Sequence, residues 1–439
     1  MADSNKHTPL LRFPEFLNDE EWAMDSMESI FEIKNGYTPS KSNPDFWTDG
    51  TIPWFRMEDI RKNGHILSNS IQHITPGAVK SAGLFPAYSI IVATTATIGE
   101  HALIIVDSLA NQQFTFLTKR KSFDNRIDMV YFHYFMFIID EWCKQNTNAG
   151  GLLSVNMEAF KKLVIPYPAS LSEQRKIAEC FSSIDKQIAA TKRKLEQLKE
   201  HKRGLMQRIF PVKGKTVPEL RFPEFQNDGE WEERSFSDIF TFIPNNTLSR
   251  ANLNNENGSV QNVHYGDVLI RFRECLNVQN EQLPFISDVQ DIDRYYKVKL
   301  VNGDVIIADT AEDETVGKCT ELVGHTNGII VSGLHTIAIR PNKIFATGYL
   351  GFYINSNSYR EQLTQIMQGV KVLSISKTAI SQTKIHFPSS ISEQGKIAHS
   401  LSSINDVIKS YEDKITALEL HKKGLMQQLF PNLPHHETN

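Results

Sequence analysis

The sequence predicts an α+β protein: two mixed α/β blocks separated by two long antiparallel coiled-coil helices, related by a pseudo-two-fold internal repeat. Three observations predict this fold. The chain has 439 residues, which is more than one hydrophobic core usually holds. Two segments of the first half recur in the second half. Each half ends in a long stretch whose apolar residues follow the period of a coiled coil.

The repeated segments mark the two halves of the chain. LRFPEFLNDEEW at Leu11–Trp22 returns as LRFPEFQNDGEW at Leu220–Trp231, with 10 of 12 positions identical. Leu171–Phe210 returns as Ile391–Phe430, with 19 of 40 positions identical. Between these markers the halves share little, so each half combines a constant frame with a variable insert. This pattern favours two recognition domains with different targets over a duplicated enzyme.

The two constant stretches predict helices. In the first, Ser172 and Glu173 form a fair N-terminal cap, no Pro interrupts the stretch, and Pro211 ends it. Apolar residues recur with 4-3 spacing, which predicts a left-handed coiled coil. The helices must run antiparallel to pair, because the second begins where block two ends. The seam positions are Ile177, Phe181, Ile184, Ile188, Leu195, Leu198, Ile397, Leu401, Ile404, Ile408, Ile415 and Leu418.

These signals also predict the domain boundaries. The chain divides into block one, helix one, a linker, block two, helix two and a polar tail. In that order they span residues 11–170, 171–210, 211–219, 220–390, 391–430 and 431–439.

Composition excludes several classes of protein. Hydrophobic residues make up 40% and charged residues 22% of the chain, as in ordinary globular domains. The longest apolar stretch, 131–139, is far short of the roughly 20 residues that span a bilayer. The first residues lack the architecture of a secretion signal. Four scattered cysteines with no CxxC spacing argue against a zinc site and favour a reducing compartment, so we expect a cytoplasmic protein without membrane contact.

Charge limits how the protein binds nucleic acid. The net charge of −4 excludes a globally basic binder, so a DNA-binding surface must be local or shared with a partner. Helix one is locally basic, with 10 Lys or Arg against 5 Asp or Glu over 172–210. Helix two has 5 of each over 391–430.

Block one places polar residues beside strand-like runs. Asn and Gln pair bidentately with adenine, and Arg or Lys with guanine. The alternative is that the amides bond the local backbone of a turn. The candidate DNA contacts are Trp54, Arg56, Thr95, Thr97, Asn111, Gln112 and Gln113.

Block two has similar ingredients in other residues. The run 264–273 predicts a strand with alternating basic residues, and 334–340 predicts a second strand. The candidate DNA contacts are Arg271, Arg273, Lys318 and His335. The alternative is a solvated edge.

The known catalytic motifs are incomplete or absent in this sequence. Asn43-Pro44-Asp45-Phe46 approximates an amino-methyltransferase motif but lacks its second Pro and any Gly-rich cofactor loop. Gly214-Lys215-Thr216 resembles the end of a P-loop, but Ile209 stands where the first Gly belongs. No metal-ligand spacing and no nucleophile elbow occur. The sequence therefore predicts a binding protein with no catalytic residues and no metal.

Taken together, the span Leu11–Phe430 resembles the specificity subunit of type I restriction–modification systems. LRFPEF…W opens each half, and SEQxKIA…HKxGLMQxxFP resembles the family's helical spacer. IPWFRMEDI, LFPAYSIIVATTATIGE and ANQQ resemble one class of target recognition domain; GDVLI, GDVIIADTAEDETVGK and GLHTIAIRP resemble another.

The resemblance implies a mechanism. Each target recognition domain would recognise one half of a bipartite, asymmetric site in double-stranded DNA, and the helices would set the gap between the halves. Two modification (methyltransferase) subunits would dock on the chain and methylate one adenine in each half-site, and restriction subunits would add translocation and cleavage. S-adenosylmethionine, ATP and Mg²⁺ would belong to these partners, with no cofactor in this chain.

Two alternatives belong to other classes. One is a non-enzymatic coiled-coil adaptor whose blocks bind proteins. The other is a fused or stand-alone methyltransferase, which the missing cofactor motif disfavours. The target bases and the gap in base pairs do not follow from the sequence.

Overall fold

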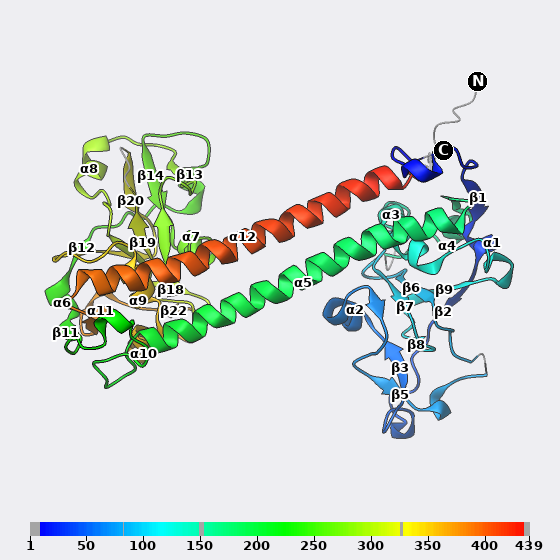
Figure 1. Cartoon of the computed structure of the whole chain (residues 1–439), viewed down its shortest axis with the longest axis horizontal. Helices are drawn as coiled ribbons and strands as arrows, with labels where there is room; N and C mark the ends of the chain where they lie inside the picture. Colours follow the sequence, from blue (N-terminus) through cyan, green and yellow to red (C-terminus); the bar gives the residue numbers. More distant parts are fainter. Residues whose placement is uncertain (1–8, 82, 149–152, 325–327, 434–439) are drawn as a thin grey trace. The chain divides into compact units, whose positions relative to one another are not determined.

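The computed structural model describes residues 9–81, 83–148, 153–324 and 328–433, and Figure 1 shows its elements along the chain. The chain forms two compact units. Unit 1 contains residues 1–191 and 414–439, and unit 2 contains residues 192–413. Of the predicted tail 431–439, residues 434–439 lie outside the described part.

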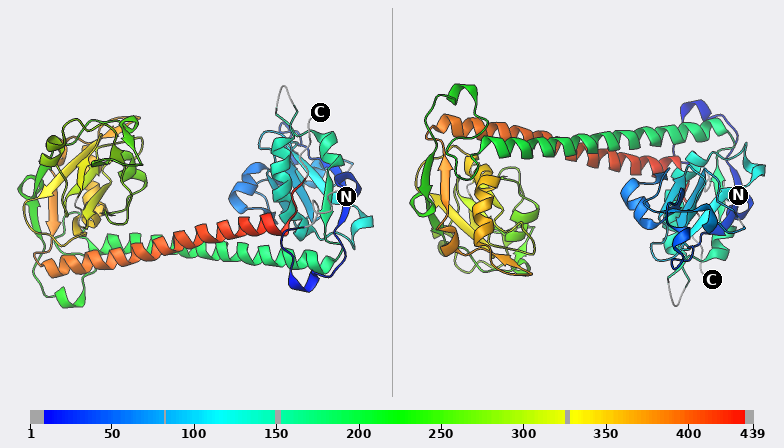
Figure 2. Two further views of the ribbon diagram at one scale, coloured as in Figure 1. Left: turned by 90° about the horizontal axis from the view of Figure 1, so that it is seen from above. Right: turned by 90° about the horizontal axis from the view of Figure 1, so that it is seen from below.

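Two long helices contribute to both units. Helix α5 spans Leu171–Ile209 and helix α12 spans Ile391–Leu429. Unit 1 therefore holds the first half of α5 with the last part of α12, and unit 2 holds the remaining parts. In each unit the sheets lie to one side of these helical segments (Figure 2).

Unit 1 is built on two main sheets and a two-stranded ribbon. The five-stranded sheet has the order β2-β9-β6-β7-β4, with β2 Phe31–Asn35, β9 Phe114–Lys119, β6 Ser89–Ala93, β7 His101–Ile104 and β4 Ile66–Leu67. The second sheet is β5-β3-β8, with β5 His73–Ile74, β3 Ile52–Phe55 and β8 Leu109–Ala110. The ribbon pairs β1 Ala23–Ser26 with β10 Val164–Tyr167.

Unit 2 repeats this arrangement with one more strand in its second sheet and a second ribbon. Its five-stranded sheet is β12-β21-β17-β19-β15, with β12 Phe240–Ile243, β21 Thr336–Pro341, β17 Val305–Ala308, β19 Cys319–Val323 and β15 Cys275–Asn277. Its second sheet is β13-β16-β14-β20, with β13 Leu253–Asn254, β16 Phe285–Ile286, β14 Val260–Val263 and β20 Ile329–Ser332. Two ribbons pair β11 Glu232–Ser235 with β23 Lys384–Phe387 and β18 Thr310–Ala311 with β22 Leu373–Ser374.

Short helices connect these strands. In unit 1 they are α1 Met27–Ile30, α2 Met57–Asn63, α3 Met129–Gln145 and α4 Met157–Lys162. In unit 2 they are α6 Phe236–Ile239, α7 Tyr265–Ile270, α8 Ile292–Lys297, α9 Tyr349–Ile354, α10 Asn357–Ile366 and α11 Lys377–Ile380. The predicted strand over 264–273 is wrong, because His264 caps helix α7 by accepting from the Gly266 amide at 3.2 Å.

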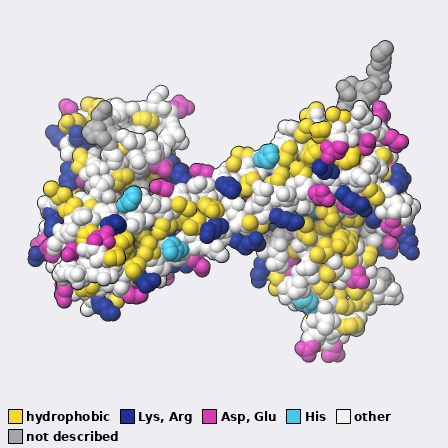
Figure 3. Space-filling view, in the orientation of Figure 1, with side chains coloured by type: hydrophobic (Ala, Val, Ile, Leu, Met, Phe, Trp, Pro, Cys, Tyr) yellow, Lys and Arg dark blue, Asp and Glu magenta, His cyan; other side chains and the backbone are white. Residues whose placement is uncertain are grey.

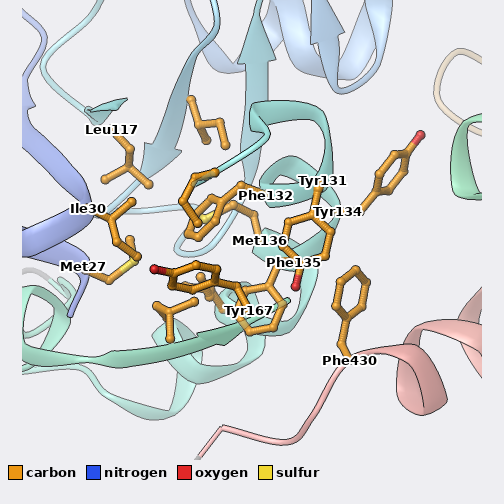
Figure 4. Packing of buried hydrophobic residues seen from close by; sticks show 14 of the residues in the cluster. Met27, Ile30, Leu117, Tyr131, Phe132, Tyr134, Phe135, Met136, Tyr167 and Phe430 are labelled. Atoms are coloured by element: carbon orange, nitrogen blue, oxygen red, sulfur yellow. The ribbon is translucent and has the colours of Figure 1, made fainter. Parts of the chain in front are cut away.

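The ends of the long helices complete the domain cores. In unit 1, Phe181 of α5 and Phe430, just after α12, stack with ring centroids 5.6 Å apart. Figure 4 shows Phe430 beside Tyr131 and Phe135 of α3. In unit 2 the residue after α5, Phe210, packs in the same way among aromatic rings. Each core thus contains the start of one long helix and the end of the other.

The helices run antiparallel, as predicted. Within unit 2, Lys199 of α5 lies 3.5 Å from Glu412, and three residues later Lys202 shares Glu274 with Asn405 of α12. The residue numbers of the partners on α12 therefore fall as those on α5 rise. Among the seam candidates, Ile177, Phe181, Ile184, Ile188, Leu195, Ile397, Leu401, Ile408 and Ile415 are buried, and Leu198, Ile404 and Leu418 are half-buried. Four of the buried ones, Ile177, Phe181, Ile397 and Leu401, belong to the domain cores.

The repeated sequence motifs make one structural joint in each unit. The Arg12 guanidinium donates two hydrogen bonds of 2.7 Å to Glu173, at the start of α5. Its counterpart Arg221 donates two of 2.8 Å to Glu393, at the start of α12. Both glutamates are 1% exposed. The LRF and SEQ motifs therefore anchor the beginning of each long helix to its domain through a buried bidentate pair.

Candidate nucleic-acid interface

In unit 1 the loops that follow three strands converge on one polar rim. The Asn111 amide, after β8, donates to the Phe55 carbonyl of β3 at 3.1 Å. The Thr94 amide, after β6, donates to the Gln113 carbonyl at 3.2 Å. Thr95 forms a bridge with Ser154. We call the loops 94–99 and 111–113 with Arg56 the unit 1 rim.

The predicted amide cluster lies on this rim and is partly engaged. The Asn111 side chain donates to Gln113 Oε1 at 3.2 Å, and Gln112 Oε1 accepts from the Thr38 hydroxyl. Gln112 and Gln113 are nevertheless exposed. Neither side-chain NH2 group donates to another of the described residues, so the turn interpretation and the DNA interpretation are compatible at these residues.

The loop between β6 and β7 holds the predicted threonines. Thr95 and Thr97 are half-buried, and Ala96 between them is exposed with φ of 64°. A non-glycine residue in this left-handed region is strained and needs support from its surroundings. The Thr95–Ser154 bridge supplies that support.

Arg56 and Trp54 differ in access. Arg56 lies at the start of α2, its guanidinium 3.1 Å from Glu58 and with 31% of the side chain exposed. Trp54 is 2% exposed, and its indole NH donates to the Tyr37 carbonyl at 3.1 Å. A ring this deeply buried has no free face for a base, which corrects the prediction for Trp54. Its ring instead lies beside Arg56, whose guanidinium carbon is 5.8 Å from the ring centroid.

Unit 2 presents the same rim backbone with other side chains. The Gly333 amide donates to the Val263 carbonyl at 2.9 Å, and the Asp309 amide donates to the His335 carbonyl at 3.1 Å. Thr310 pairs with Ser374. These bonds match those of unit 1 one for one. We call the loops 309–315 and 333–335 with His264 the unit 2 rim.

His335 occupies the place of Gln113 and belongs to a small cluster. Its Nδ1 lies 3.4 Å from both the Asp309 carboxylate and the Thr310 hydroxyl. Its ring meets Tyr265 edge-on, with centroids 5.3 Å apart. His335 has φ of 55°, so this rim also holds a strained residue. Burial lowers the pKa of the adjacent His264, which favours its neutral form.

The other three block-two candidates lie away from this rim. Arg273 donates to the Asn405 carbonyl at 2.8 Å and to Glu412 at 2.6 Å, both on α12. Lys318 donates to the Leu269 carbonyl at 2.8 Å, and Arg271 to the Gln282 carbonyl at 3.0 Å. They gather near the C-terminal end of α7, facing the long helices, because the run 264–273 folds as a helix and a turn.

Several residues on or beside the rims were not predicted as DNA contacts. His264 and Asp309 lie on the unit 2 rim. Thr38 contacts Gln112 of the unit 1 rim, and Tyr265 contacts His335 of the unit 2 rim. Aligning ADTAEDETVGK with ATTATIGE places Asp309 opposite Thr94. That alignment could have identified Asp309 as a candidate from the sequence, because Thr94 lies on the unit 1 rim. His264 and Tyr265 were missed because their run was taken for a strand.

Neither a cluster of metal-ligating side chains nor a membrane-spanning helix occurs among the described residues. No group of three or more His, Cys, Asp or Glu side chains in that part of the chain is placed to hold a metal ion. No described helix has the length and apolarity to cross a membrane.

Comparisons with known proteins agree on one family. The family model described as "Type I restriction modification DNA specificity domain" matches residues 19–200 and again 228–420. The EcoprrI specificity subunit of Escherichia coli is 45% identical over 174 residues, which are 39% of this chain and 43% of that protein. The MjaVIII specificity subunit of Methanocaldococcus jannaschii is 22% identical over 315 residues, 69% of each chain. The stronger match thus spans less than half of its relative.

Solved structures share the fold. The type I restriction–modification S subunit from M. genitalium aligns with a TM-score of 0.55 at 14% identity, covering 97% of this chain and all of that one. A chain described under complex assembly and conformational transition of the type I R-M system aligns with a TM-score of 0.56 at 16% identity, covering 96% of this chain and 98% of that one. Since the family model matches both halves, the chain belongs to the family of type I restriction–modification DNA specificity proteins.

Proposed function

We propose that this chain is the DNA-recognition subunit of a type I restriction–modification complex. The unit 1 rim recognises one half of a bipartite, asymmetric site in double-stranded DNA, and the unit 2 rim recognises the other half. The paired helices α5 and α12 set the gap between the half-sites and dock the modification subunits.

The observation that carries the proposal is the matched pair of rims. Identical backbone bonds present different side chains: amides at 111–113 in unit 1, and the His335–Asp309 cluster in unit 2. Side-chain amides suit adenine, a carboxylate accepts from the cytosine amino group, and an imidazole can donate or accept. One frame with two sets of side chains suits recognition of two different sequences.

The chemistry belongs to partners in this proposal. Two methyltransferase subunits use S-adenosylmethionine to methylate an adenine in each half-site, and restriction subunits use ATP and Mg²⁺. The chain itself contributes binding and orientation without catalysis, and we place the complex in the cytoplasm. An adaptor that binds proteins has less support, since the matching family model describes a DNA specificity domain.

Methylome sequencing tests this function. Cells that lack other methyltransferases would express the chain together with its proposed methyltransferase partner. We expect adenine methylation at a single two-part sequence with a fixed gap, and none when either gene is expressed alone. Methylation at a continuous sequence, or methylation by the chain alone, would contradict the proposal.

A further inference from the structure

Unit 2 contains a basic pocket that the rim does not use. Its volume is about 470 Å³, and it lies between α5, α12 and the end of α7. Cationic side chains from two directions line it: Lys199, Lys202 and Arg203 from α5, and Arg271, Arg273 and Lys318 from the domain. We call it the α7 pocket.

The carboxylates of this pocket are already neutralised. The lining includes six cations against Glu274 and Glu412, a net charge of +4. Glu274 is bound by Lys202 at 2.5 Å and by Asn405 at 2.9 Å. Glu412 is bound by Arg273 at 2.6 Å. The remaining positive charge therefore has no counter-ion in the pocket lining.

Two guanidinium groups are available to an incoming anion. Arg203 is exposed, and its side chain makes no ion pair or hydrogen bond within the described part of the chain. Arg271 shares Asp267 with Arg250, at 3.4 Å against 2.6 Å, so its own pair is the weaker one. One of its terminal nitrogens donates to the Gln282 carbonyl at 3.0 Å, and the guanidinium keeps further N–H donors for an anion. Arg271 is 39% exposed.

The pKa of Lys318 is affected by the other charged groups of the same pocket. Burial lowers its pKa first of all, and the nearby Lys202 and Arg273 lower it further against the opposing effect of Glu274. Burial disfavours a charge of either sign, so only the smaller effect of Lys202 and Arg273 favours an anion at this place.

Unit 1 does not repeat this arrangement. In the helical repeat, Lys199 corresponds to Glu419. In the matched sheets, Lys318 corresponds to Glu100, since their carbonyls accept from Ala308 and Ala93 at the ends of β17 and β6. Reversed charges at two positions make the α7 pocket a property of unit 2.

We propose that the α7 pocket binds a backbone phosphate of the DNA, held by Arg203 and Arg271. The proposal rests on the DNA-recognition function proposed above. DNA fits better than an acidic protein segment because α5 stays basic beyond the pocket: residues 192–203 contain six Lys or Arg against Glu196 and Glu200. Figure 3 shows Lys and Arg side chains gathered on the middle of this helix. A long basic strip matches an evenly charged polyanion, and guanidinium forks match phosphate oxygens. The contact adds affinity without sequence preference.

The salt dependence of DNA binding tests this contact. The complex of the full chain with its methyltransferase would be titrated against two labelled duplexes over a series of salt concentrations. One duplex carries the recognition site found by methylome sequencing, and the other carries a scrambled version of that sequence. Removing one phosphate contact reduces the slope of log K against log salt by about 0.9. Because both arginines hold the same phosphate, we expect Arg203→Gln with Arg271→Gln to reduce the slope by about 0.9 on both duplexes, leaving their affinity ratio unchanged.

A matched control and two other outcomes make the test decisive. Lys213→Gln removes an exposed cation of the linker, outside the pocket, and should leave the slope unchanged. An unchanged slope in the double variant overturns the phosphate site, as does loss of methyltransferase binding with normal DNA affinity, which would indicate an acidic protein partner. If the wild-type complex does not prefer the site duplex, the proposed function fails instead. Thermal unfolding checks that the variant is folded.

Discussion

Units 1 and 2 have the same frame and differ in the side chains that the frame presents. The buried Arg–Glu pairs, the orders of the five-stranded sheets and the rim backbone bonds correspond one for one. At the rims, Gln113 is replaced by His335 and Thr94 by Asp309. The comparison indicates that, in this fold, the residues that stabilise the structure differ from those exposed to a ligand at the rims, so the rim side chains can change while the frame stays the same.

A second difference lies inside the five-stranded sheets. Leu103 of β7 pairs with Ile90, and the matching residue of β19 is Glu321, which pairs with Val305. Glu321 accepts from the amides of Gly348 and Gly351 at 2.6 and 2.9 Å. The same sheet position thus holds a packed aliphatic side chain in unit 1. In unit 2 it holds a carboxylate that accepts hydrogen bonds from the backbone amides at the start of helix α9.

The largest effect is expected from breaking the helix-end cores. Phe430→Ala should destabilise unit 1, and Phe210→Ala should destabilise unit 2, each by about 3–5 kcal/mol, because each removes a buried aromatic ring. Hydrogen exchange resolved along the sequence would locate the loss. If Phe430→Ala loosened both units equally, the helix ends would not belong to separate cores.

Glu321 makes the stability of unit 2 dependent on pH. Burial raises its pKa from 4.5 to about 7. The folded state thus keeps a proton that the unfolded state releases near pH 4.5, so stability is greatest below pH 4.5 and falls by about 3 kcal/mol as the pH rises to 7. Urea unfolding over this range should lose the effect in Glu321→Gln. Equal pH profiles for the variant and the wild type would contradict it.

Smaller effects are expected at the rims. Gln113→Ala should relax recognition of one half-site, and His335→Ala should relax the other, each by about 1–3 kcal/mol of discrimination. Sequencing of methylated sites would show relaxed bases in one half. The matched control Lys213→Gln should leave both halves as they were. If either rim variant relaxed both halves, the rims would not act independently.

The helices were predictable because their signal is local. The 4-3 spacing from Ile177 to Leu418 lies in the sequence itself and is set by the geometry of paired helices. The bidentate Arg12–Glu173 pair was not predicted, since it joins residues 161 positions apart. The repeats marked both ends of that pair without indicating the contact.

The rims were predictable in part. The amides at 111–113 stood out by composition, but their meeting with residues 55 and 94 depends on pairing between distant strands. Trp54 looked like a contact residue and is a core residue, because burial depends on the sheet around it. Arg271 and Arg273 alternate as in a strand, but the capping His264 turns that run into a helix.

The most direct test of the central claim is an exchange of one domain. Residues 23–170 would be replaced by the corresponding block of another family member, keeping the Arg12–Glu173 pair and both long helices intact. Methylome sequencing with the cognate methyltransferase then gives both half-sites at once. If the two rims recognise DNA independently, one half-site changes to that of the donor, while the other half-site is retained. A change in both half-sites, or in neither, would contradict the account.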